Sequence, residues 1–283
     1  MAGPEPLTSR AKRVSAARRL AKRAYRAADR RFVAEGPQAV REALAREAAQ
    51  PGAVVEVFAT AEAAQRHPDL LAAARASGLP VHAIGDEAMA SIAQTVTPQG
   101  IVAVCAFLDV SLDAVLRGPG AAARLVAVLA HVRDPGNAGT VLRSADAAGA
   151  DAVVLTDASV DPYNGKCVRA SAGSLFHLPI STGAPAPEAL AALRSAGLRV
   201  VAADGSGEDL DDVDAAGGLA GPTAWIFGNE AWGLPPETLA LADAVVRVPI
   251  YGAAESLNLA TAAAVCLYAS ARAQRRPGGC RTP

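Results

Sequence analysis

The sequence predicts an α/β protein with two domains, the second of which is built on a parallel sheet. Three observations lead to this fold class. The chain has 283 residues, which is enough for two domains. Apolar runs of strand length alternate with segments of helix length along most of it. These runs are nearly continuous, as is typical of parallel strands covered on both faces.

The first thirty residues form a basic segment. Residues 9–31 contain no Gly or Pro and are rich in Ala, Arg and Lys, which favours a helix whose order could depend on binding a partner. We therefore predict a basic N-terminal helix or tail over residues 1–30.

Residues 31–108 alternate between strand-like and helix-like patterns and predict a small α/β domain. We expect a strand, a Gly-Pro turn and a helix within 32–47, strands over 53–60, 80–85 and 100–107, and helices over 68–78 and 86–94. Gly118, Pro119 and Gly120 mark residues 109–123 as a linker.

Residues 124–273 predict the larger α/β domain, and residues 274–283 a flexible tail. The expected strands cover 124–130, 151–156, 177–181, 199–204, 223–228 and 244–250. The expected helices begin near 138 and cover 164–174, 187–197, a short segment after 237, and 257–274.

Charge is distributed unevenly along the chain. The net charge is −1, but residues 1–31 carry ten Lys or Arg and two acids, which leaves 17 basic and 26 acidic residues elsewhere. A segment this basic favours a polyanion such as nucleic acid. The alternative is a solvated helix that only keeps the protein in solution.

Cysteine usage and hydropathy point to an intracellular protein. Cys105, Cys167, Cys266 and Cys280 form no CxxC pair and no metal-ligand spacing, so we expect free thiols and no metal site. No apolar run reaches the length of a membrane span. We expect a soluble cytoplasmic protein, and the acid-poor N-terminus leaves an organellar transit peptide as the alternative.

Four loops rich in Gly and polar residues follow predicted strands: 133–143, 156–171, 228–235 and 249–258. In open α/β sheets, ligands bind beyond the carboxyl ends of the strands. None of these loops has a nucleotide-binding glycine fingerprint, which disfavours a nicotinamide or triphosphate site.

Each candidate residue in these loops has a structural alternative. Asn137 could be a helix cap, and Arg143 could pair with Asp146. Ser256 could cap the last helix. Glu230 follows an apolar strand, where a carboxylate is costly unless it holds a ligand or a backbone amide.

Taken together, the loops resemble the SpoU (TrmH) family of RNA 2'-O-ribose methyltransferases in the SPOUT class. The chain reads N-x-G-x-x-x-R from Asn137, G-N-E-x-x-G-L from Gly228, and V-P-I-x-G-x-x-x-S-L-N from Val248. The segment 164–180 and parts of 32–105 also resemble the family, the latter its ribosomal-protein-like substrate-binding domain. The last motif departs from the family pattern, because Ala260 stands where a second Ser is common.

The resemblance implies a deep trefoil knot in the C-terminal domain, a homodimer whose subunits share groups between active sites, and S-adenosylmethionine as cofactor. It assigns cofactor binding to Gly228, Val248, Ile250 and Leu257. It implies a catalytic arginine at Arg143, supported by a polar set of Asn137, Glu230, Ser256 and Asn258.

The implied reaction moves a methyl group from a sulfonium to a ribose 2'-hydroxyl. A guanidinium with a pKa above ~12 is a poor base, so we expect Arg143 to hold the substrate phosphate and steer the hydroxyl, with Glu230 as the rival base. Arg169 could hold a phosphate or form a structural ion pair.

The substrate-binding domain and basic segment favour structured RNA, with ribosomal RNA ahead of transfer RNA. A non-catalytic RNA-binding or ribosome-assembly factor on the same fold is one alternative, and a Rossmann-like small-molecule enzyme is another. The target nucleotide stays open, as does the choice between housekeeping modification and antibiotic self-resistance.

Overall fold

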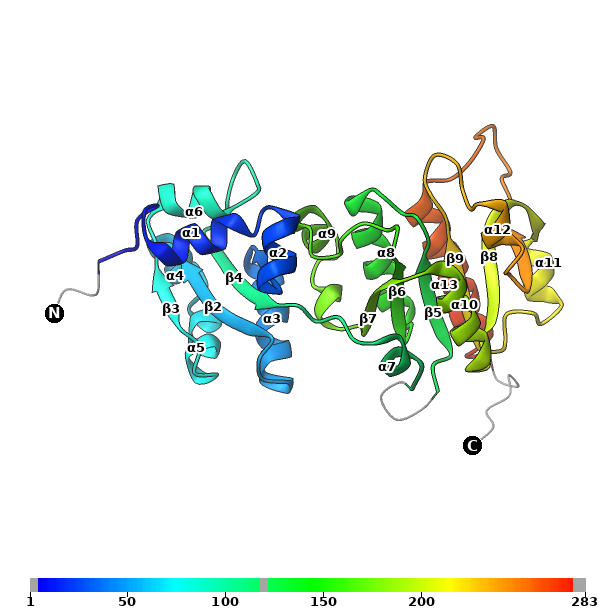
Figure 1. The fold of residues 1–283 in the computed structure, drawn as a ribbon, viewed down its shortest axis with the longest axis horizontal. Coiled ribbons are helices and arrows are strands. Elements are labelled where there is room, and N and C mark those ends of the chain that lie inside the picture. The colour runs from blue at the N-terminus through cyan, green and yellow to red at the C-terminus, as the bar shows by residue number, and fades with distance from the viewer. Residues whose placement is uncertain (1–4, 118–121, 277–283) are drawn as a thin grey trace. The chain divides into compact units, whose positions relative to one another are not determined.

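The computed structural model describes residues 5–117 and 122–276, which form two compact units (Figure 1). The first unit comprises residues 1–108 together with Asp161–His177, and the second comprises Asp109–Val160 with Leu178–Pro283. Gly118, Pro119 and Gly120 of the expected linker, Cys280, and the end of the expected C-terminal tail lie outside the described residues.

A four-stranded sheet forms the first unit, in the order β1-β4-β2-β3. These strands are Arg31–Glu35 (β1), Ile101–Ala106 (β4), Val54–Ala59 (β2) and Val81–Ala83 (β3). The strand β4 is antiparallel to β1 and β2, and β2 is parallel to β3. The helices of this unit are Lys12–Arg19 (α1), Arg23–Asp29 (α2), Pro37–Ala49 (α3), Ala61–Arg66 (α4), Pro68–Ala76 (α5), Asp86–Ile92 (α6) and Gly165–Ala170 (α9).

The basic N-terminal segment belongs to the first unit and, of the predicted helix or tail, forms the helical alternative as the two helices α1 and α2. Val14, Ala17 and Leu20 are buried in one apolar cluster with Phe58 and Met89. The Lys and Arg side chains point outward: nine of the ten in this segment are exposed. The few apolar residues of this basic segment therefore hold α1 against the core, while its Lys and Arg side chains lie on the surface.

The segment Asp161–His177 also folds with the first unit, although its position in the chain places it inside the predicted C-terminal domain. Its Tyr163 ring stacks on Phe107 with a centroid distance of 3.9 Å and lies 4.8 Å from Phe32. Phe176 stacks on the other side of this cluster, 5.9 Å from Phe32. Aromatic residues, which are scarce in this chain, thus concentrate where the segment packs.

A buried ion pair fixes the start of this segment. The Arg26 guanidinium, whose side chain is 3% exposed, lies 2.7 Å from the Asp161 carboxylate. Its Nη1 also donates to the carbonyl oxygens of Leu20 and Ala21, at 2.9 and 2.8 Å. Arg26 therefore ties the break between α1 and α2 to the segment that returns from the second unit.

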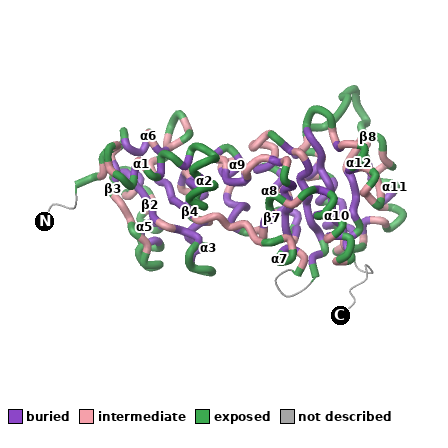
Figure 2. The backbone as a smooth tube through the Cα atoms, in the orientation of Figure 1, coloured by how far each residue is buried: buried purple, intermediate pink, exposed green. Residues whose placement is uncertain are grey.

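The second unit is a six-stranded sheet in which every neighbouring pair is parallel, so the predicted fold class is confirmed. The strand order β10-β8-β9-β5-β6-β7 corresponds to Ala244–Arg247, Arg199–Asp209, Thr223–Phe227, Leu125–Leu129, Ala152–Thr156 and Ile180–Ala184. Every residue of β5, β6 and β9 is buried (Figure 2).

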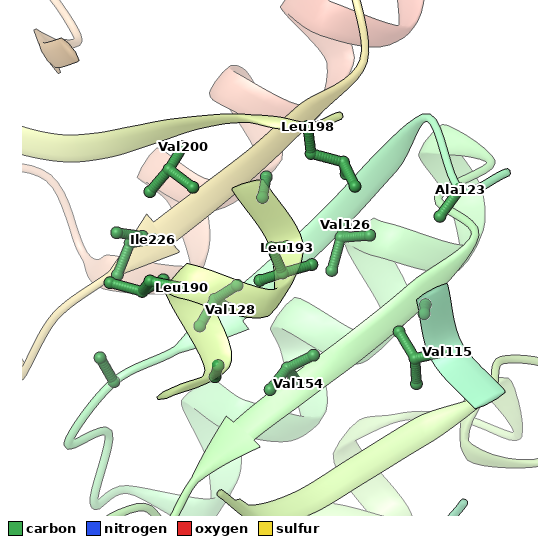
Figure 3. Close-up of a cluster of buried hydrophobic side chains, with 14 of the residues drawn as sticks. Val115, Ala123, Val126, Val128, Val154, Leu190, Leu193, Leu198, Val200 and Ile226 are labelled. Atoms are coloured by element: carbon green, nitrogen blue, oxygen red, sulfur yellow. The ribbon is translucent and has the colours of Figure 1, made fainter. Parts of the chain in front are cut away.

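Helices cover both faces of this sheet, as the continuous apolar strands require. On one face, Leu190 and Leu193 point toward Val126, Val128 and Val154 (Figure 3). On the other face, Trp225 donates its indole N–H to Ser270 Oγ at 2.8 Å. The helices of the unit are Leu112–Arg117 (α7), Pro135–Ala148 (α8), Ala186–Ser195 (α10), Leu210–Ala215 (α11), Pro236–Leu239 (α12) and Leu259–Ala273 (α13).

Part of the expected linker is structured, because α7 lies within residues 109–123 and buries Val115 in the core of the second unit. The prediction of a linker relied on Gly118, Pro119 and Gly120 and gave too little weight to the apolar residues before them. The expected helix over 164–174 is also divided, into α9 and a 3-10 turn over Ser174–Phe176.

Cys105, Cys167 and Cys266 are free and buried, which confirms the predicted free thiols at these three positions. Burial raises the pKa of Cys266 to about 12 and raises the pKa of Cys105 further, since a thiolate loses its hydration there. Within residues 5–117 and 122–276, no cluster of three or more His, Cys, Asp or Glu could hold a metal. No helix in these ranges is long and apolar enough to cross a membrane.

We expect Arg26→Ala to destabilise the first unit by about 3 kcal/mol, because it removes a buried guanidinium and leaves the Asp161 carboxylate, whose side chain is only 12% exposed, without its charged partner. Chemical denaturation followed by circular dichroism measures this as a lower unfolding midpoint. Arg23→Ala, an exposed position of the same helix, serves as the matched control. Equal midpoints for the two variants would contradict a stabilising role for the Arg26 ion pair.

Candidate active site

The candidate site lies at the carboxyl edge of the parallel sheet, where segments distant in the sequence meet. The loops after β5 and β9 and the segment 248–258 after β10 all leave the sheet at this edge. The last of these is the orange segment between β10 and α13 in Figure 1. The parallel topology alone therefore brings the three sequence motifs together.

The first motif begins at the N-terminus of α8, where the cap is Asp134 and not Asn137. Asp134 Oδ1 accepts from the backbone N–H of Asn137 at 2.8 Å, and Pro135 takes the first helical position. The structural alternative in which Asn137 caps this helix is therefore not observed. Since Asp134 meets the needs of the helix, the Asn137 amide is available for contacts with other loops.

Glu230 binds the loop after β5. Its Oε1 accepts from the Asn137 Nδ2 at 3.2 Å and from the backbone N–H of Asp134 at 3.3 Å. Its Oε2 lies 3.5 Å from the backbone nitrogen of Arg133. The carboxylate is exposed and not buried as its sequence context suggests, but it does hold backbone amides, as one of the two predicted alternatives states.

Asn258 completes the connection from the C-terminal motif. Its Nδ2 donates to the Asn137 Oδ1 at 3.1 Å, while its own Oδ1 accepts from the backbone N–H groups of Ala260 and Thr261. Asn258 is thus the N-cap of α13, and the alternative that gave this role to Ser256 is wrong. Glu230, Asn137 and Asn258 form one chain of hydrogen bonds across three motifs.

Arg143 lies farther along α8, six residues after Asn137, and is exposed. Within residues 5–117 and 122–276 it makes no hydrogen bond or ion pair, so the alternative of a pair with Asp146 is not observed. An unpaired guanidinium on a rigid helix is free to bind an anion from outside the chain.

A cavity of about 340 Å³ opens beside the hydrogen-bonded chain. Its wall includes all four residues predicted to bind the cofactor, together with two of the polar set: Gly228, Val248, Ile250, Leu257, Glu230 and Ser256. Asn137, Arg143 and Asn258 are not among the residues that line it. The predicted residues therefore fall into two groups. Six line the cavity, whereas Asn137 and Arg143 lie on α8 and Asn258 caps α13.

Glycines shape the loop that forms one wall of the cavity. A Cβ atom on Gly228 would lie 2.4 Å from the carbonyl carbon of Gly233, so only glycine allows this loop to fold back on itself. Asn229 and Gly233 exchange two backbone hydrogen bonds, at 2.7 and 2.9 Å. The Gly-x-x-x-x-Gly spacing thus fixes the shape of the loop before any ligand binds.

Two residues of the site, Asn229 and Asp204, were not singled out from the sequence. The buried Asn229 donates its Nδ2 to the His131 carbonyl at 2.9 Å and so joins the loops after β9 and β5. Asp204, at the end of the regular part of β8, lines the cavity. Asn229 belongs to the quoted G-N-E motif, which could have indicated it.

Arg169 lies in the first unit, where it forms an ion pair with Glu35 at 3.5 Å. Of its two predicted roles, the structural ion pair is the one observed. Glu35 also accepts from the backbone N–H of Gln94 and from the Thr95 hydroxyl, so this carboxylate organises the loop before β4.

The cavity suits a small molecule with apolar and positively charged parts. Its volume lies within the ~300–1,000 Å³ of typical small-molecule sites. Val248, Ile250 and Leu257 supply apolar surface, while Asp204, Glu230 and Glu255 supply carboxylates. Its remaining charged lining residue, Arg247, is 2.9 Å from Asp209. The residues present therefore fit S-adenosylmethionine, whose nucleoside and sulfonium have these properties.

Comparisons with known proteins agree with the resemblance. A model of the SpoU rRNA Methylase family matches residues 124–268, and a model of the MRM3-like substrate binding domain matches residues 11–103. The chain is 37% identical over 238 residues to the 23S rRNA (guanosine(2553)-2'-O)-methyltransferase of Bacillus subtilis. The aligned region covers 84% of this chain and 87% of the relative.

Solved structures are similar over nearly the whole chain. The AdoMet-bound rRNA methyltransferase of Sinorhizobium meliloti is 30% identical, with a TM-score of 0.80 over 95% of this chain and 97% of that one. The SpoU methyltransferase AviRb of Streptomyces viridochromogenes, in complex with AdoMet, is 29% identical, with a TM-score of 0.78 over 93% of this chain and 98% of that one.

We expect Asn258→Ala to lower the free energy of unfolding by about 1 kcal/mol, the usual cost of losing a helix N-cap. Ser256→Ala is the matched control, because Ser256 is exposed and caps no helix. Urea unfolding measures both. A larger loss for Ser256→Ala than for Asn258→Ala would contradict the observed cap.

Proposed function

The chain belongs to the SpoU rRNA methylase family, and we propose that it transfers a methyl group from S-adenosylmethionine to a ribose 2'-hydroxyl of ribosomal RNA. The observation that carries this proposal is the chain of hydrogen bonds from Glu230 through Asn137 to Asn258 beside a cavity of about 340 Å³. It gives three separate motifs one shared function, which is to hold two reactants in fixed relative positions.

The cofactor supplies an activated methyl group, so this chain must position the acceptor and manage one proton. The apolar residues Val248, Ile250 and Leu257 would hold the nucleoside, with Gly228 keeping the backbone of the loop close. Ser256, which is exposed on the cavity wall, offers a hydroxyl to either reactant.

Arg143 holds the RNA phosphate and steers the 2'-hydroxyl in this proposal. Its guanidinium is exposed and unused by the described fold, and a guanidinium is unsuited to accept a proton. Glu230 is the rival base, but its two oxygens already accept N–H groups of Arg133, Asp134 and Asn137. These contacts favour a positioning role for Glu230.

The proposed enzyme is a homodimer formed through the second unit. Large apolar side chains are exposed on α13 and just before it: Val265, Tyr268 and Leu257 are each 37% exposed or more. A group of exposed apolar side chains is typical of a protein interface. The helix α13 packs beside α8, as the hydrogen bond from Tyr268 Oη to the Ala147 carbonyl indicates. An interface here would bring the Arg143 of one subunit toward the other.

We also propose the trefoil knot that the family resemblance implies. The segment 248–258 leaves β10 at one edge of the sheet, and α13 then packs against β5 and β9 in the middle of the sheet.

A cytoplasmic location likewise stays a prediction. The intact motif residues support catalysis over a non-catalytic role on the same fold, and the match to a substrate-binding domain supports ribosomal over transfer RNA.

Labelled S-adenosylmethionine tests the function directly. We expect the protein to label ribosomal RNA at ribose 2'-oxygens, and Arg143→Ala to lower turnover by orders of magnitude while cofactor affinity changes by only a few fold. Mapping of 2'-O-methyl marks identifies the nucleotide. A protein that binds the cofactor but labels no RNA would support the non-catalytic alternative, and near wild-type turnover in Arg143→Ala would remove this residue from the mechanism.

The exposed Lys and Arg residues of the N-terminal segment, here called the basic face of the first unit, offer a second test. Removing the whole N-terminal segment would also remove Val14, Ala17 and Leu20 from the core, so we choose surface charges instead. Lys12, Arg18, Lys22 and Arg23 are exposed and make no ion pair with other described residues.

Replacing these four residues with Gln should weaken RNA binding and flatten its salt dependence, because each phosphate contact adds about 0.9 to the slope of log K against log salt. Fluorescence anisotropy at several salt concentrations measures both quantities. A second fourfold variant, in which Arg75, Arg117, Arg124 and Arg272 are replaced with Gln, controls for net charge, because these residues are exposed, lie outside this segment and make no ion pair with other described residues. An unchanged slope in the fourfold variant would assign the basic face to solubility.

A further inference from the structure

Asp204 lies on the cavity wall in a defined position that the sequence motifs do not include. It lies in the stretch of β8 between Ala202 and Glu208, where the pairing with β10 shifts register between Val245 and Val246. Its Oδ1 accepts from the backbone N–H of Ser206 at 3.0 Å and from the Ser206 hydroxyl at 2.7 Å. One carboxylate oxygen is therefore fixed by the turn itself.

The second oxygen of Asp204 is directed at the opposite wall. A Cβ atom on Gly233 would lie 3.3 Å from Asp204 Oδ2, which places this oxygen next to the loop after β9. In the part of the chain that the structure describes, Oδ2 accepts no hydrogen bond. Asp204 is half-buried, so solvent screens its charge less than that of an exposed carboxylate.

The charges around the cavity leave Asp204 as its best-placed free carboxylate. Glu230 accepts N–H groups from the loop after β5, and Glu255 is exposed. The cation of Arg247 is paired with Asp209 outside the cavity lining. A ligand in this cavity therefore meets an excess of negative charge, with Asp204 fixed in the wall.

We propose that Asp204 makes the cavity prefer the positively charged methyl donor over the demethylated product. This rests on the proposed function, since it concerns the ligand pair of the same cavity. S-adenosylmethionine carries a sulfonium, an ammonium and a carboxylate, whereas S-adenosylhomocysteine has lost the sulfonium charge. A fixed carboxylate attracts the donor more than the product, so Asp204 favours loading of one and release of the other.

Isothermal titration calorimetry of the full chain with each compound tests the role of Asp204. Asp204→Asn keeps the shape and an oxygen that can accept from Ser206, but removes the charge. We expect it to weaken S-adenosylmethionine binding by about tenfold, equivalent to ~1.4 kcal/mol, and S-adenosylhomocysteine binding by less than about threefold. Sinefungin, which has an ammonium in place of the sulfonium, should follow the donor.

Two further variants make the result specific. Glu208→Gln removes an exposed carboxylate from the same strand but outside the cavity lining, and should leave the ratio of the two affinities unchanged. Ser206→Ala frees the Asp204 carboxylate and should lower the ratio by less than Asp204→Asn does.

Equal weakening of both ligands in Asp204→Asn, or no weakening, would overturn the assignment of Asp204 while leaving the proposed function intact. Wild-type protein that binds neither compound would overturn the proposed function and this proposal together. Binding by the wild type thus tests the proposed function, and the change caused by Asp204→Asn tests the role of Asp204.

Discussion

The hydrogen bond between Asn137 and Asn258 joins residues 121 positions apart in the chain, and the geometry of the site depends on it. It forms because the carboxyl ends of parallel strands all lie at one edge of the sheet. The loops after β5, β9 and β10 therefore begin at the same edge and lie close to one another. Both amide atoms of Asn137 bond to other loops, whereas Asn258 uses its Nδ2 for Asn137 and its Oδ1 for the start of α13. Secondary structure and site assembly thus share the same side chains.

Strands could be predicted from the sequence because they depend on local patterns: continuous apolar runs indicate covered strands. Asn137, Glu230 and Asn258 lie in the loops that follow such runs, and the family resemblance singled them out. The roles within each loop were harder to assign. Asp134 and Asn137 are both good helix caps, and only the backbone direction shows that Asp134 takes this role. Ser256 and Asn258 present the same ambiguity two residues apart.

Other features depend on tertiary pairing and leave no local pattern. The irregular part of β8, which sets Asp204 and Ser206 in the cavity wall, arises where its pairing with β10 shifts. Gly207 permits this shift, because a Cβ atom there would lie 2.4 Å from the Val245 backbone. The segment Asp161–His177 belongs to the first unit through Tyr163 and Phe176, whose partners lie more than fifty positions away.

The segment Asp161–His177 also limits how the first unit can be moved to another protein, in evolution or in the laboratory. The polypeptide passes from one unit to the other three times, after Leu108, Val160 and His177. A recombination event with a single crossover near residue 108 would carry the four strands of the first unit but leave behind the aromatic rings that complete its interior. The first unit is therefore discontinuous in sequence, and a graft onto another protein would have to bring both pieces at once.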